Sequence, residues 1–161
     1  MHRVHHKDLA TLLEVARPRS VLLLDPTLES LPQSNVPASC QITRLSDDIF
    51  ATLPELGLFD LGIIANTLEH LERKEAGVLL ARLRDVHTRR FVALVPLGKA
   101  WDNHRSHWHT ADLLGYGMTV MARYREADKP LHLYHYAIES YKTTPNWFNN
   151  QHWAHPERWR P

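Results

Sequence analysis

Three polar side chains that could take part in chemistry follow one apolar segment of the chain: Asn66, Glu69 and His70. The segment before them, residues 61–65, is almost wholly apolar, as in a strand covered on both faces, so the three residues would follow its C-terminal end. An imidazole with its ordinary pKa can act as a general base near neutral pH. A structural interpretation stays open, in which Asn66 caps the turn and Glu69 and His70 begin a helix.

A second polar group, the turn Asp25-Pro26-Thr27, follows the apolar run at residues 21–24. Aspartate followed by proline is typical of a helix start, with aspartate at the N-cap and proline as the first helical residue. We therefore expect a helix to begin at Asp25, whose carboxylate would accept hydrogen bonds from the first turn. The alternative is that Asp25 holds a cationic group of a ligand at the switch point of the sheet, where the strand order reverses.

Histidines are frequent after residue 100, and His104, His107 and His109 bring three imidazoles within six positions. Zinc or nickel could take three such nitrogens. The spacing is a weak metal motif because it includes no acidic ligand and no helix that fixes the rings. The sequence leaves two hypotheses, a metal site in this loop and a set of solvated loop histidines.

The elements that must position these residues alternate between strand and helix. Helical spacing of apolar residues predicts helices at residues 9–16 and 72–87, and apolar runs predict strands at residues 21–24, 40–45, 61–65 and 89–96. This alternation favours a parallel sheet with right-handed crossovers. Two more strands, at residues 118–124 and 131–136, flank a turn short enough to force an antiparallel hairpin.

Composition limits the class of protein. The 161 residues are 43% hydrophobic and 23% charged, with a formal net charge of +1, which is typical of one globular domain and gives no argument for nucleic acid or an anionic membrane as partner. No apolar run approaches the roughly 20 residues of a membrane span. The single cysteine, Cys40, excludes an intramolecular disulfide. We expect a cytoplasmic protein.

The segment FDLGIIANTLEHL, residues 59–71, resembles the fourth-strand signature of class I S-adenosylmethionine (SAM)-dependent methyltransferases, commonly FDLVxxSDVLEHL. The next helix and strand, and the two strands of the hairpin, are similar to the elements that follow in that superfamily, so the resemblance covers residues 21–138. It implies a short, divergent bacterial member of the superfamily. The implied fold is a truncated Rossmann-like three-layer α/β sandwich, with a mostly parallel sheet that ends in an antiparallel hairpin.

The resemblance also implies roles for individual residues. Asn66 would face cofactor or substrate and His70 would lie near the transferred methyl group. Asp47 or Asp48 would be either the acid that holds the ribose hydroxyls or the aspartate near the adenine. The candidate cofactor-binding residues are therefore Asp25, Thr27, Asp47, Asp48, Asn66 and Glu69, with His70 as the candidate catalytic residue.

Two departures from the superfamily pattern put its cofactor in doubt. The first loop is normally Gly-x-Gly-x-Gly, and its glycine positions are Asp25, Thr27 and Glu29 in this chain. Glycines there allow close backbone approach, whereas side chains at Asp25 and Thr27 would occupy the space of the methionine part of SAM. In addition, the interval between residues 24 and 59 is too short for two strand–helix units, which predicts that one unit has been lost.

The expected organisation is a methyltransferase-like domain at residues 1–138 and a Trp- and His-rich tail at residues 139–161. The tail carries Trp147, Trp153 and Trp159, and it would pack on its own domain or form an interface with a second copy or another protein. The leading functional hypothesis is a non-catalytic binding or regulatory role with a degenerate cofactor loop. The alternatives are an active SAM-dependent methyltransferase acting on a small molecule and a metal-binding protein.

Overall fold

The computed structural model describes residues 5–27, 29–31, 34 and 36–138, so the tryptophan-bearing tail lies outside the described residues. Six strands form one sheet in the order β2-β1-β3-β4-β6-β5. Pairs among β1 to β4 are parallel, whereas β6 runs antiparallel to both β4 and β5. The predicted parallel sheet with a terminal hairpin is confirmed. The strands are β1 (Ser20–Leu24), β2 (Gln41–Leu45), β3 (Phe59–Ile64), β4 (Thr88–Pro96), β5 (Thr119–Glu126) and β6 (Lys129–Ala137).

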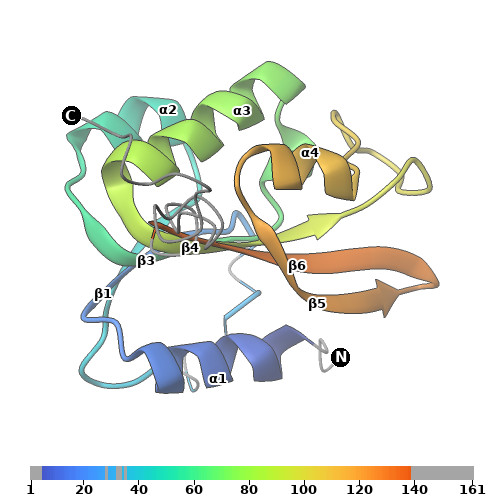
Figure 1. Ribbon diagram of the computed structural model, residues 1–161. Helices are drawn as coiled ribbons and strands as arrows, with labels where there is room; N and C mark the ends of the chain where they lie inside the picture. Colours follow the sequence, from blue (N-terminus) through green and yellow to red (C-terminus); the bar gives the residue numbers. More distant parts are fainter. Residues whose placement is uncertain (1–4, 28, 32–33, 35, 139–161) are drawn as a thin grey trace, which may run out of the picture.

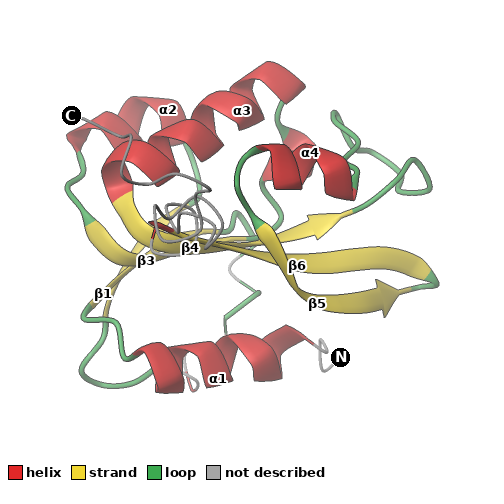
Figure 2. Ribbon diagram, in the orientation of Figure 1, coloured by secondary structure: helices red, strands yellow, loops and turns green. Residues whose placement is uncertain are grey.

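Helices cover both faces of this sheet (Figures 1 and 2). One face carries α1 (His5–Ala16), and the opposite face carries α2 (Ile49–Thr52), α3 (Arg73–Arg82) and α4 (Thr110–Gly115). The result is the three-layer α/β sandwich implied by the resemblance. None of the described helices is long and apolar enough to cross a membrane.

Each strand face supplies one of two hydrophobic cores, and β1 shows this clearly. Leu22 and Leu24 belong to the core beneath α2 and α3, whereas Val21 and Leu23 belong to the core beneath α1. Successive side chains of a strand point to opposite faces, so a strand buried on both faces must be apolar throughout. The four residues are fully buried, which explains the uninterrupted apolar run in the sequence.

On the side of β1 away from β3, the sheet has few strands. A single strand, β2, pairs there, with Val21 opposite Ile42 in register, and it forms the edge of the sheet in the described chain. The described residues between β1 and β2 include no α-helix. The sheet is therefore truncated where the sequence predicted a missing strand–helix unit.

The long helix predicted at residues 72–87 ends earlier than expected. The α-helix α3 stops at Arg82 and is followed by a π-helical turn, Leu83–His87. Val86 follows Leu83 at helical spacing, yet Val86 is 58% exposed whereas Leu83 is fully buried. A π turn holds more residues per turn than an α-helix, so residues within it, Val86 included, no longer lie on the face that the α-helical spacing predicts.

Candidate functional site

The turn after β1 is organised by the carboxylate of Asp25. Its Oδ1 accepts hydrogen bonds from the backbone N–H of Thr27 at 3.0 Å and from the Thr27 hydroxyl at 2.8 Å, and its Oδ2 accepts one from the N–H of Ser30 at 2.8 Å. This is the local pattern of an Asx turn, in which aspartate bonds the backbone two residues ahead. The prediction of a helix starting at Asp25 is wrong, because the carboxylate closes a turn instead.

A fourth hydrogen bond to Asp25 comes from the segment after the adjacent strand, β3. The side-chain amide of Asn66, directly beyond β3, lies 3.1 Å from Oδ1 of Asp25 and 3.2 Å from the hydroxyl oxygen of Thr27. Burial alone would raise the pKa of Asp25, but the hydrogen bonds from Ser30, Asn66 and Thr27 outweigh it and lower that pKa. The carboxylate therefore stays ionised inside a ring of donors that the chain itself supplies.

Two residues at the site adopt the left-handed backbone region. Asn66 has φ +48° and Asp48, which immediately precedes α2, has φ +46°. Asparagine and aspartate tolerate this region better than other side-chain-bearing residues. The conformation at Asn66 turns the chain after β3, and the Asn66 amide meets the turn after β1.

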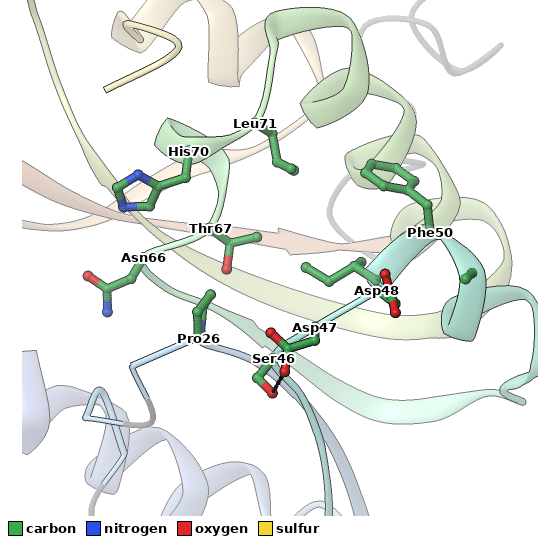
Figure 3. Close-up of a pocket in the computed structure, with 11 residues that line it drawn as sticks. Pro26, Ser46, Asp47, Asp48, Phe50, Asn66, Thr67, His70 and Leu71 are labelled. Carbon is green, nitrogen blue, oxygen red and sulfur yellow. Dashed lines mark hydrogen bonds between the residues drawn. The ribbon is translucent and has the colours of Figure 1, made fainter. Parts of the chain in front are cut away.

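A pocket of about 500 Å³ opens where β1, β2 and β3 end, and we call it the edge pocket. Figure 3 shows Asn66 and His70 on one side of it and Asp47, Asp48 and Phe50 on the other. Both aspartates are exposed to solvent. The structure thus brings together candidate residues from two separate stretches of the sequence, the turn after β2 and the turn after β3.

A smaller pocket of about 100 Å³ shares Asn66 and His70 with the edge pocket, and we call it the Glu69 pocket. Glu69 is 4% exposed, and its Oε2 has no hydrogen-bond partner among the described residues. Burial, with a smaller contribution from the negative charge of Asp25, raises the pKa of Glu69 to about 7. Sequence reasoning placed Glu69 near a cofactor and missed its burial.

The histidine-rich loop contributes to the wall of the Glu69 pocket. The ring of His104 stacks on Trp101 with centroids 5.7 Å apart and meets the ring of His70 edge-on at 5.5 Å. The ring centroid of His107 lies 6.4 Å from that of His104. His109 directly precedes α4. In the described part of the chain, no group of three or more His, Cys, Asp or Glu side chains could hold a metal ion.

Solved structures with a similar fold are SAM-dependent methyltransferases. The magnesium protoporphyrin IX methyltransferase of Synechocystis PCC 6803, solved with bound SAM, aligns over 80% of this chain and 76% of its own at 14% identity, with a TM-score of 0.56. A Burkholderia thailandensis 1,6-didemethyltoxoflavin-N1-methyltransferase, solved with S-adenosylhomocysteine (SAH), aligns over 84% of this chain and 80% of its own at 14% identity, with a TM-score of 0.54.

The methyltransferase domain of bacterial CtHen1 aligns over 82% of this chain and 96% of its own at 12% identity, with a TM-score of 0.54. These similarities establish the class I methyltransferase-like fold. No curated protein matches the sequence. A family model matches residues 3–160, nearly the whole chain. The chain belongs to DUF6231, a family of unknown function.

Proposed function

We propose that this methyltransferase-like protein does not bind SAM efficiently and acts as a non-catalytic binding or regulatory module. The observation that carries the proposal is the buried Asp25 carboxylate, which fills the first loop with hydrogen bonds from Thr27, Ser30 and Asn66. In methyltransferases of this superfamily the same loop is glycine-rich and leaves room for the cofactor.

The methionine part of SAM does not fit this loop for two physical reasons. A ligand carboxylate placed near Asp25 would meet a second, buried negative charge, and repulsion between two desolvated charges is strong. To admit that group, the bond between Asp25 and Asn66 would have to open. The buried Asp25 carboxylate would then lose a hydrogen-bond donor, at a cost of about 1–3 kcal/mol for an unsatisfied buried group.

The nucleoside part of SAM finds a more suitable surface. The edge pocket has room for a group of that size and carries Asp47 and Asp48 at its rim. Both aspartates follow β2, the strand that pairs directly with β1. This position supports the role of ribose-holding acid over that of the aspartate near the adenine. Binding of a nucleoside alone is therefore compatible with the degenerate loop.

The alternative function is an active SAM-dependent methyltransferase acting on a small molecule. One observation favours it: Asn66 and His70 line both the edge pocket and the Glu69 pocket, as residues between a cofactor and an acceptor would. SAM, when bound, supplies an already reactive methyl group, so the enzyme mainly positions the acceptor. In this case Asp47 or Asp48 would hold the ribose, and Asn66 and His70 would orient the acceptor.

A thermal-shift titration of the full chain with SAM, SAH and adenosine tests the proposal. A ligand that binds the folded state raises the melting temperature, and the rise grows with the logarithm of the ratio of ligand concentration to Kd. We expect adenosine to stabilise the protein at least as much as SAM, because only the nucleoside part fits. A shift with SAM or SAH that greatly exceeds the shift with adenosine would contradict the proposal and support the alternative.

A further inference from the structure

The Glu69 pocket is assembled from parts of the chain that are far apart in sequence. His5 from α1, Glu69 and His70 after β3, Trp101 from the loop after β4, and Glu126 at the end of β5 line it. The Tyr124 hydroxyl donates a hydrogen bond to Asp8, which fixes α1 against the β5–β6 hairpin. The walls of the pocket are therefore held in place by the packing of several elements and by this hydrogen bond.

Glu69 brings a hydrogen-bond acceptor into this pocket. The backbone carbonyl of Glu69 accepts hydrogen bonds from the N–H groups of Arg105 at 2.8 Å and Ser106 at 3.2 Å, so these two donors are not free for the side chain. The side-chain Oε2 is buried and has no hydrogen-bond partner among the described residues. A buried carboxylate oxygen without a donor is costly and is rare in folded proteins.

Two of the N–H-bearing side chains that line the pocket are engaged elsewhere. The amide of Asn66 is bonded to Asp25 and Thr27, and the indole N–H of Trp101 donates to the carbonyl of Leu97 at 3.0 Å. Burial, together with the neighbouring His70 and His107, lowers the pKa of His104, so this imidazole is disfavoured as a cationic partner for the Glu69 carboxylate. In the described part of the chain, Glu69 Oε2 is therefore open to a donor that a ligand brings.

We propose that the Glu69 pocket binds a compact organic cation that carries N–H donors, either a primary ammonium or a guanidinium group. Two carboxyl side chains, Glu69 and Glu126, line the pocket and disfavour an anion. Trp101 and Leu131 provide an apolar wall for the carbon atoms of such a ligand. The volume of about 100 Å³ restricts the bound group to a few heavy atoms.

Calorimetric titration of the full chain tests this proposal with methylammonium chloride and methylguanidinium chloride as probes. We expect binding of at least one of them and none of tetramethylammonium, which has the same charge but no N–H group. Glu69→Gln removes the charge at nearly constant shape and should weaken binding about tenfold or more, the range for a hydrogen bond to a charged group. Glu55→Gln, an exposed glutamate outside the pocket, should leave binding unchanged.

A second measurement keeps the test decisive if Glu69→Gln does not fold. A cation that pairs with Glu69 near pH 7 stabilises the ionised carboxylate, so wild-type protein should release a fraction of a proton on binding, measured as a buffer-dependent binding heat. Absence of binding, equal binding of tetramethylammonium, or binding without proton release would overturn the proposal. Tighter, Glu69-dependent binding of zinc or nickel chloride would replace it with a metal site. The titrations contain no SAM, so their outcome is independent of the proposed function.

Discussion

Asp25 and Asn66 are 41 residues apart in sequence, and their side chains meet at 3.1 Å beyond the ends of the adjacent parallel strands β1 and β3. The contact joins the turn where a methyltransferase would have its glycine loop to the segment that resembles the superfamily signature. It gives the buried Asp25 carboxylate a donor from a second strand end. The pair thus fills the position of the glycine loop with a side-chain hydrogen bond, which glycine, having no side chain, could not make.

Replacing Asp25 with alanine should destabilise the fold. The substitution removes an acceptor of four hydrogen bonds and leaves the buried Ser30 N–H and the half-buried Asn66 amide without it. We expect the free energy of unfolding in urea to fall by about 2–4 kcal/mol. Asp47→Ala, at an exposed aspartate of the same edge, is the matched control and should change it by less than about 0.5 kcal/mol. Equal effects of the two substitutions would argue against the Asp25 network.

The raised pKa of Glu69, about 7, predicts an unusual pH dependence of stability. The folded protein holds a proton on Glu69 between the unfolded pKa near 4.5 and about 7, so stability is highest below this interval and falls as pH rises through it. Between pH 5 and pH 8 the titration of Glu69 should lower the free energy of unfolding by about 2–3 kcal/mol. Urea denaturation should show this loss in wild type and not in Glu69→Gln.

Glu55→Gln controls for the removal of a carboxylate elsewhere, and it should keep the wild-type pH dependence. The comparison uses the change with pH rather than the absolute stability, since a buried glutamine amide has hydrogen-bonding needs of its own. The same slope in wild type and Glu69→Gln would show that Glu69 titrates at its ordinary pKa.

Gly62 in β3 allows close packing beneath the site. A Cβ at this position would lie 2.9 Å from Cγ2 of Thr88 and 3.0 Å from Cβ of Phe91, both in the neighbouring strand β4. We expect Gly62→Ala to lower the free energy of unfolding by about 1–3 kcal/mol, the usual cost of overpacking. Gly57→Ala, where a Cβ meets no atom within 4 Å, should be nearly neutral in the same urea experiment. A neutral Gly62→Ala would show that the two strands can move apart freely.

Much of the fold was predictable because it depends on local pattern. Strands buried on both faces appear in the sequence as uninterrupted apolar runs. The two-residue turn Ala127-Asp128 permits only antiparallel pairing of the strands that it joins. The missing strand–helix unit was visible as a short interval before Phe59. The resemblance of residues 59–71 supplied the order of the elements.

The site was less predictable because its decisive contacts are long-range. Asp25-Pro26 has the local signature of a helix start, but the partner that completes the turn network, Asn66, comes from another strand end. Glu69 is buried because residues 105 and 106 fold over it and donate to its carbonyl, and no spacing in the sequence marks that contact. Local patterns could name these residues as candidates but could not give their protonation or partners.

The central claim is that the Asp25 network prevents productive binding of SAM, and calorimetric titration of the full chain with SAM tests it most directly. The account predicts a Kd no tighter than about 1 mM, which corresponds to stabilisation of about 0.4 kcal/mol or less at about 1 mM ligand. A micromolar Kd, equivalent to about 4 kcal/mol under the same conditions, would contradict the account and favour an active methyltransferase.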